Sequence, residues 1–293
     1  MFNMQSDGAE KVGVIGLGII GNQVAAQLRE SGRHVYVWNR SPKPEPNFVS
    51  SPAEVAKLSE VIHIFVRDGE ALVEMVTAMK DELCKRHTIV NNCTADPESV
   101  VKAYQIAIEA GASFLDAPFT GSKLAAGNGA LVYYIGGDPA VLEKVTPVLE
   151  VTSKEILYLG RVGEATVLKI ATNMITATTV EVLSEAYGLV TAAGINPDSL
   201  AQAIEHNACG SALTEMKLPT MIERDYEPHF SLKNMFKDAQ YALSLGKSLG
   251  VDLPATSTTA NIMFRALKND LGEKDFSVIA ERFQKADESE GEK

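Results

Sequence analysis

A lysine and an asparagine one helical turn apart are the side chains of this sequence best suited to acid–base chemistry. Lys169 and Asn173 are four positions apart in a segment without proline, so they lie on one face of a predicted helix. An ammonium group can protonate a carbonyl oxygen as negative charge develops on it, and an amide can hold a neighbouring polar group. A solvated helical lysine is the alternative interpretation, but the place of Lys169 just after the glycine turn Gly160–Gly163 favours a catalytic role.

A loop rich in small and hydroxylated residues is the second candidate site. The loop follows Asp116 and contains Thr120, Gly121, Ser122 and Lys123. Its backbone amides and two hydroxyl groups are hydrogen-bond donors, and the lysine adds positive charge. This combination predicts a site for a small anion, although Lys123 could equally be an ordinary solvated lysine.

A glycine-rich turn near the N-terminus predicts a dinucleotide site. Gly16, Gly18 and Gly21 stand between an apolar run and a helix-like stretch. In this spacing the first glycine allows a tight turn, the second lets the backbone approach phosphates, and the third lets the helix pack closely on the strand. The N–H groups of the first helical turn then bind the anion. We therefore expect the pyrophosphate to meet the turn residues Gly16, Leu17, Gly18, Ile19 and Ile20.

The end of the second predicted strand indicates which dinucleotide is bound. A site for NAD usually has Asp or Glu here to accept bonds from the adenosine ribose, whereas this chain has Asn39. Asn39 removes a carboxylate that would repel a 2′-phosphate, and Arg40 and Ser41 supply a guanidinium and a hydroxyl group for it. A solvated loop arginine is the alternative. The pattern favours NADP(H) as the cofactor.

The predicted elements of the first half form an α/β domain. Apolar runs at 12–15, 34–38, 61–66, 88–91 and 130–135 alternate with helical segments such as 19–30. Another helix is expected to start at Ser51-Pro52-Ala53-Glu54, a capping box with proline at the first helical position. This alternation predicts a Rossmann-type, doubly wound parallel sheet over residues 1–162, with ligands at the carboxyl ends of its strands.

The pattern changes after the first domain. Residues 163–193 contain no proline and no strand-like alternation, and Gly194 is a natural helix stop. The remaining segments are also helical in pattern. We therefore expect an all-α domain over residues 163–293 that begins with one long helix joining it to the first domain. A cleft between the two domains is the expected active site.

Composition and charge exclude several classes of protein. The chain has 27 basic and 38 acidic residues and a net charge of −11, which argues against a general nucleic-acid or membrane surface. No apolar run approaches the ~18 residues of a membrane span and no secretory leader pattern is present, so a cytoplasmic location is expected. Cys84, Cys93 and Cys209 lack metal-ligand spacing and are interpreted as buried thiols in a reducing compartment. The histidines form no such spacing either, and no metal site is predicted.

Two further groups are interpreted as structural. Glu181 and Glu185 are expected to form a solvated or interface face of the long helix rather than an acid–base pair. Met216, Met221 and Met235 are expected to fill the core.

Taken in order, four motifs resemble the β-hydroxyacid dehydrogenase family over nearly the whole chain. Within that family the Gly121-Ser122-Lys123 and Asn39-Arg40-Ser41 segments are most similar to the branch of NADPH-dependent glyoxylate/succinic semialdehyde reductases. The four motifs are the glycine turn, the Asp116-Ala117-Pro118 loop, the helix start that carries Lys169 and Asn173, and the pair Lys237-Asp238.

The resemblance implies roles for the matching residues. Lys169 resembles the catalytic lysine of the family and Asn173 its substrate-orienting amide. Thr94 matches a loop near the nicotinamide, and Lys237 a lysine that contacts substrate or cofactor.

Substrate-binding residues are implied in the same way. Thr120 and Gly121 match the substrate loop, with threonine where serine is usual, and Phe230 and Asp238 match the wall of the cleft.

The resemblance and the residues together predict an NADPH-dependent reductase of a small carboxylate-bearing aldehyde or 2-oxo acid. Succinic semialdehyde and glyoxylate are the leading substrates, with Lys169 as general acid. The alternatives are an oxidising dehydrogenase of substrates like 3-hydroxyisobutyrate, an imine reductase, and a non-catalytic NADP-binding module. The long helix and the modest helical domain predict a homodimer or homotetramer.

Overall fold

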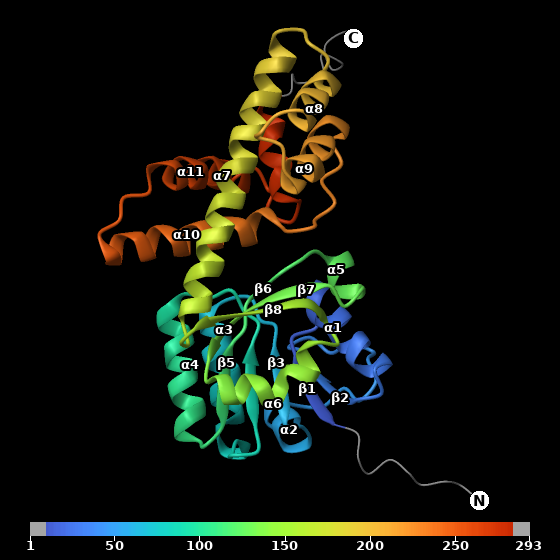
Figure 1. The fold of residues 1–293 in the computed structure, drawn as a ribbon, viewed down its shortest axis with the longest axis vertical. Coiled ribbons are helices and arrows are strands. Elements are labelled where there is room, and N and C mark those ends of the chain that lie inside the picture. Colours follow the sequence, from blue (N-terminus) through green and yellow to red (C-terminus); the bar gives the residue numbers. More distant parts are fainter. Residues whose placement is uncertain (1–9, 284–293) are drawn as a thin grey trace, which may run out of the picture. The chain divides into compact units, whose positions relative to one another are not determined.

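The computed structural model describes residues 10–283 of the chain (Figure 1). The chain divides into two compact units, Met1–Lys169 and Ile170–Lys293. This division falls within the first turns of the long helix, a few residues after the predicted boundary between 162 and 163.

The N-terminal unit is built on one mixed sheet whose order is β2-β1-β3-β4-β5-β7-β6, with β8 paired to β7. Strands β1 to β5 are parallel to one another. Both faces of the sheet that they form carry buried apolar side chains. The strands are β1 (Lys11–Ile15), β2 (His34–Trp38), β3 (Val61–Ile64), β4 (Thr88–Asn91), β5 (Ser113–Asp116), β6 (Phe119–Thr120), β7 (Leu131–Gly137) and β8 (Ser153–Gly160).

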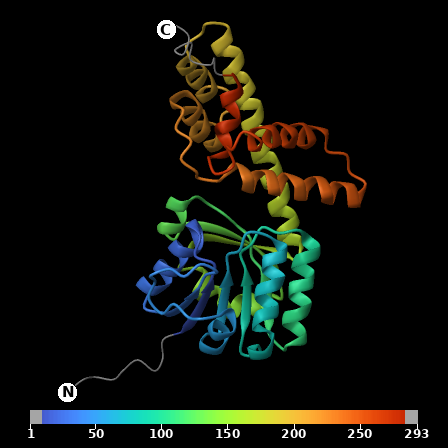
Figure 2. The same ribbon diagram turned by 180° about the vertical axis from the view of Figure 1, so that it is seen from behind.

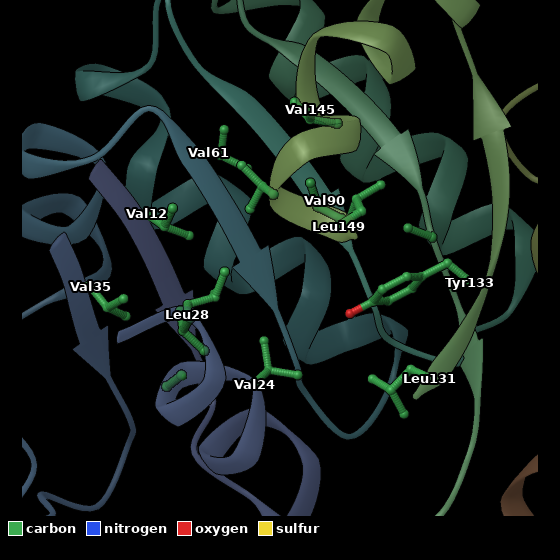
Figure 3. Close-up of a cluster of buried hydrophobic side chains, with 14 of the residues drawn as sticks. Val12, Val24, Leu28, Val35, Val61, Val90, Leu131, Tyr133, Val145 and Leu149 are labelled. Carbon is green, nitrogen blue, oxygen red and sulfur yellow. The ribbon is translucent and has the colours of Figure 1, made fainter. Parts of the chain in front are cut away.

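Helices cover both faces of this sheet, which confirms the doubly wound architecture. The side chains of α1 and α6 pack into one apolar cluster, and those of α2, α3 and α4 pack into another on the opposite face. Figure 3 shows part of the first cluster, with Val24 and Leu28 of α1 and Leu149 of α6. The helices are α1 (Ile19–Glu30), α2 (Pro52–Leu58), α3 (Gly69–Met79), α4 (Pro97–Glu109), α5 (Lys123–Gly127) and α6 (Pro139–Leu149), with a 3₁₀ turn at Lys80–Glu82.

The sheet differs from the all-parallel prediction at one edge. Strand β7 runs antiparallel to β5 and β6, because the short connection over residues 121–130 returns the chain beside the strand it has just left. Helix α6 then carries the chain across to β8, which is parallel to β7. Strand β8 was not predicted, since none of its residues is buried and they show no apolar alternation.

The predicted start of α2 is confirmed, although its capping contacts are only half of a capping box. Ser51 Oγ accepts a hydrogen bond from the backbone N–H of Glu54. The Glu54 carboxylate accepts instead from the backbone N–H and hydroxyl of Ser50.

The C-terminal unit is helical, as predicted. Helix α7 (Glu164–Ala192) has 29 residues and is followed by Gly194, which has a φ of +74°. The apolar faces of the helices meet in one cluster that includes Val180, Met221 and Met263. The other elements are α8 (Pro197–Glu205), α9 (Ala212–Glu223), α10 (Leu232–Leu249), α11 (Pro254–Leu267) and the 3₁₀ helix η2 (Phe276–Phe283). Helices α10 and α11 lie side by side in both views (Figures 1 and 2). Among residues 10–283, no helix is both long enough and apolar enough to cross a membrane.

Several structural interpretations of single residues are wrong. Cys84 and Cys209 are exposed, and only Cys93 is the expected buried thiol. Met216 is also exposed, unlike Met221 and Met235, because it faces away from the cluster of the C-terminal unit.

Glu181 requires a correction as well. It is buried rather than solvated, because the guanidinium of Arg282 on η2 pairs with its carboxylate, with one N–O distance of 2.8 Å. The Glu185 side chain stays exposed, as expected.

Candidate active site and cofactor site

The glycine turn between β1 and α1 has a geometry that excludes larger residues. Gly16 has a φ of +94°, and a Cβ atom there would lie 2.0 Å from the carbonyl oxygen of Phe65. A Cβ atom at Gly21 would lie 2.0 Å from the carbonyl oxygen of Gly16. Both contacts are far inside the van der Waals limit, so strand β1, the loop after β3 and helix α1 can approach only because these positions are glycine.

The start of α1 fits the pyrophosphate of a dinucleotide. Its N-cap residue is Gly18, which has no side chain to occupy the N–H groups of the first turn. A Cβ atom at Gly18 would meet no described atom within 4 Å, so that side of the turn is open. Ile19 and Ile20 contribute the next N–H groups, and the helix dipole favours an anion there.

Asn39 braces the glycine turn from the end of β2. Its side-chain oxygen accepts a hydrogen bond from the Leu17 N–H at 3.0 Å, and its amide nitrogen donates to the Ser41 carbonyl at 2.8 Å. Lys43 Nζ donates to the carbonyl oxygen of Leu17. Lys43 was not among the predicted cofactor residues, although a lysine three residues after Arg40 in the same loop is a signal for an anion site.

Arg40 lies at the surface of the same loop. Its side chain is 71% exposed and pairs with Glu74 of α3 at 3.1 Å. An exposed pair of this kind contributes at most about 1 kcal/mol, so the guanidinium is available to a more highly charged anion. Ser41 is also exposed.

Buried polar side chains join the carboxyl ends of β3, β4 and β5. His63 lies 2.9 Å from the side-chain oxygen of Asn92, whose amide nitrogen donates to the Ala117 carbonyl at 2.8 Å. Burial lowers the pKa of His63 to about 4, so the neutral ring uses Nδ1–H as the donor to Asn92. This chain of bonds supports the loop that carries half-buried Thr94.

The catalytic candidate Lys169 lies on the second turn of α7, whose start is held by Asp116. One carboxylate oxygen of Asp116 accepts the N–H groups of Gly163 and Thr166, each at 3.0 Å, and the other accepts the Thr166 hydroxyl at 2.8 Å. Asp116 thus supplies the capping oxygen that Gly163 lacks. The Lys169 side chain is only 8% exposed, unlike a solvated helical lysine.

Asn173, Lys237 and Asp238 form a cluster in the C-terminal unit. The Asp238 carboxylate is buried and accepts from the Asn173 amide at 2.6 Å and from Lys237 Nζ at 2.7 Å. Lys237 also lies 4.7 Å from the centre of the Tyr241 ring. These contacts hold the Asn173 amide in a defined orientation on α7, on the same face as Lys169.

The predicted substrate loop lies between β6 and α5. Thr120, Gly121 and Lys123 are exposed, and Ser122 caps α5 by accepting the N–H of Ala125 at 3.2 Å. Gly121 has a φ of +144°, and a Cβ atom there would lie 2.7 Å from Leu131. The turn therefore requires glycine, and it leaves the loop amides at the surface.

Phe230 lies in the segment before α10 and is half-buried. Its ring meets the Phe276 ring edge-on, with centroids 6.4 Å apart. Phe230 is one of the partly buried side chains that pack against the apolar cluster of the C-terminal unit.

Comparison with known proteins shows the family and the fold. Residues 11–160 match the family model of the NAD binding domain of 6-phosphogluconate dehydrogenase, and residues 163–283 match that of the NAD-binding region of NADP-dependent 3-hydroxyisobutyrate dehydrogenase. The solved structure of a 3-hydroxyisobutyrate dehydrogenase from Mycobacterium tuberculosis with L-serine is 23% identical and superposes with a TM-score of 0.86 over 94% of this chain and all of that one. The family matches, together with this fold, identify the chain as an NAD(P)-dependent oxidoreductase.

Two relatives narrow the assignment. Glyoxylate/succinic semialdehyde reductase 1 of Arabidopsis thaliana is 30% identical over 281 residues, which cover 92% of this chain and 97% of the relative. The 2-hydroxy-3-oxopropionate reductase of Escherichia coli is 29% identical, over 94% of this chain and 97% of the relative. The chain belongs to the β-hydroxyacid dehydrogenase family, as the sequence motifs predicted.

Proposed function

We propose that this protein uses NADPH to reduce a small aldehyde or 2-oxo acid that carries a carboxylate. Succinic semialdehyde, which would give 4-hydroxybutyrate, and glyoxylate, which would give glycolate, are the leading substrates. The observation that carries the proposal is the buried Lys169 one turn from Asn173, whose amide is oriented by Asp238. The similarity to a glyoxylate/succinic semialdehyde reductase supports the substrate class.

NADPH is proposed to bind at the glycine turn. The N–H groups at residues 18–20 would hold the pyrophosphate, because those of Gly16 and Leu17 already donate to Trp38 and Asn39. Arg40, Ser41 and Lys43 would hold the 2′-phosphate. The cofactor supplies a hydride to the substrate carbonyl carbon. Thr94 is proposed to contact the nicotinamide end.

The protein is proposed to supply the proton and the orientation. As the carbonyl oxygen gains negative charge, the ammonium group of Lys169 donates a proton to it, an effect worth roughly 10²–10⁴-fold in rate. Asn173 donates from its amide to the substrate, and Lys237 pairs with the Asp238 carboxylate that orients this amide. The Thr120–Lys123 loop binds the substrate carboxylate through its amides, hydroxyl groups and ammonium.

We also propose that the protein is a homodimer or homotetramer. Ile175, Val182 and Leu189 are exposed and follow one another at intervals of seven residues along α7. Such a stripe suits a second copy of the same helix, because identical apolar seams with a seven-residue repeat can pack against each other.

The test is NADPH consumption with succinic semialdehyde and glyoxylate by the wild type, by Lys169→Ala and by the control Lys102→Ala, which alters an exposed lysine of α4. We expect turnover that falls at least about a hundredfold in Lys169→Ala only. Equal turnover in the two variants would overturn the role of Lys169. A wild type that binds NADPH but reduces neither substrate would favour the imine reductase or the non-catalytic module, and faster oxidation of 3-hydroxyisobutyrate would favour the dehydrogenase.

A further inference from the structure

A buried ion pair in the C-terminal unit has no part in the proposed chemistry. Lys217 of α9 donates from Nζ to both carboxylate oxygens of Asp275, at 2.7 and 2.8 Å. The two side chains are only 3% and 1% exposed. Burial acts to raise the pKa of Asp275, but the Lys217 ammonium and hydrogen bonds from Ser277 outweigh it and hold that pKa below its ordinary value. These contacts therefore favour the carboxylate form of Asp275.

The same carboxylate holds the segment that ends in Phe230. One Asp275 oxygen accepts the backbone N–H groups of His229 at 3.1 Å and Phe230 at 3.2 Å. The Asp275 N–H donates to the Tyr226 carbonyl at 2.9 Å, which joins the beginning of the segment to the same residue. The segment 226–230 is thus held by Asp275 at both ends, by its backbone N–H at Tyr226 and by its carboxylate at His229 and Phe230.

The Phe230 side chain is fixed through Phe276 as well. The Phe276 N–H donates to the Phe230 carbonyl at 3.1 Å, and the two rings meet edge-on. Lys217 Nζ lies 4.6 Å from the centre of the Phe276 ring, which places the ammonium against the ring that supports Phe230. Asp275 thus holds the Phe230 backbone, and Lys217 contacts the ring against which Phe230 packs.

A buried ion pair is a poor means of gaining stability, since apolar residues of similar size often stabilise a protein equally well. A carboxylate is nevertheless well suited to collecting several N–H groups at one point. The geometry indicates that this pair serves to order the loop.

We propose that Lys217 and Asp275 are positioning residues that hold Phe230 as an apolar wall against the methylene groups of the substrate. The inference rests on the proposed function and on the family resemblance, which implies that Phe230 belongs to the wall of the substrate cleft. A wall of this kind discriminates by chain length. Succinic semialdehyde has two methylene groups that would pack on the ring, whereas glyoxylate has none.

The experiment compares KM and kcat for both substrates in Asp275→Asn, Phe230→Leu and the double variant. We expect Asp275→Asn to raise the KM for succinic semialdehyde roughly tenfold, which corresponds to the free energy of burying two methylene groups. The KM values for glyoxylate and for NADPH should change by less than about twofold. The double variant should match Phe230→Leu alone, because Asp275 acts through Phe230. Glu281→Gln is the matched control, since it breaks another ion pair of the same unit, between Glu281 of η2 and Arg224, the residue after α9. Neither of the hydrogen bonds of this pair involves Phe230.

Equal KM increases for the two substrates, or additive effects in the double variant, would overturn the proposal. If Asp275→Asn fails to fold, Lys217→Met combined with Asp275→Leu removes both charges together, and the same shift in substrate preference is expected. Hydrogen exchange of segment 227–231 separates this inference from the proposed function. Faster exchange in Asp275→Asn than in Glu281→Gln supports the positioning role even if the wild type reduces neither substrate, and unchanged exchange contradicts it.

Discussion

Asp116 on β5 caps a helix that begins 48 residues later, through its contacts with Thr166. The Thr166 N–H and hydroxyl both donate to its carboxylate, at 3.0 and 2.8 Å. Because Lys169 follows three residues later on α7, this contact sets where the proposed acid lies relative to the strand that leads into the Thr120–Lys123 loop. The Asp116-Ala117-Pro118 motif and the helix start that carries Lys169 are thereby in direct contact.

The buried Asp116 predicts a pH-dependent loss of stability. Burial raises its pKa to about 6 from 3.8, so the folded state binds the proton more tightly than the unfolded state. Its contribution to stability is therefore present at low pH and lost as pH rises from about 4 to about 6. Relative to Asp116→Asn, the free energy of unfolding of the wild type should fall by about 3 kcal/mol across this window, measured by urea denaturation. A difference that stays constant with pH would contradict the assignment.

His63 predicts the opposite slope. Burial lowers its pKa to about 4 from 6.5, so the unfolded state binds the proton more tightly. Stability from this residue is present above about pH 6.5 and is lost as pH falls toward about 4. Compared with His63→Gln, the wild type should lose about 3 kcal/mol of unfolding free energy between these limits in the same urea experiments. Parallel pH curves for the two proteins would show that His63 is not desolvated.

Arg40 is expected to set the cofactor preference. Loss of its charge-assisted bond to the 2′-phosphate in Arg40→Ala should weaken NADPH binding roughly 10- to 150-fold, while NADH binding stays the same. Isothermal titration with both cofactors measures this. Glu74→Gln is the control, because it removes the exposed partner of Arg40 and leaves the guanidinium in place. Unchanged NADPH affinity in Arg40→Ala would reject the phosphate site.

The exposed stripe on α7 predicts that self-association depends on apolar contacts. Val182→Glu should shift the mass found by light scattering toward that of one chain, because a buried unpaired carboxylate opposes association. Leu249→Glu is the control, since Leu249 is exposed at the end of α10, outside the stripe. A monomeric wild type, or the same oligomer in both variants, would remove the basis for this interface.

Local patterns predicted most of the elements that position the site. Strands β1, β2 and β4, helix α1 and the length of α7 follow from apolar periodicity, glycine punctuation and proline positions, which act within a few residues. The glycine turn was predictable for the same reason, since its steric demands concern immediate neighbours. Strand β8 was missed because it lacks a periodic apolar face.

Contacts between distant parts of the chain could not be predicted in this way. No local signal pairs Glu181 with Arg282, or Lys217 with Asp275, because burial and compensation of charge depend on which elements meet after folding. The direction of β7 also depends on how the chain returns to the sheet.

The sequence by itself determined the family, the dinucleotide turn and the identity of the residues proposed to do chemistry, because these are properties of residue type and short spacing. The tertiary structure decided which of those residues have hydrogen-bond partners, and which residues these partners are. In the folded chain Asn173 donates to Asp238, and Asp116 caps the start of α7. The tertiary structure also tied the Phe230 segment to a buried ion pair. Buried polar groups require partners, and only the folded chain brings such partners within hydrogen-bond distance.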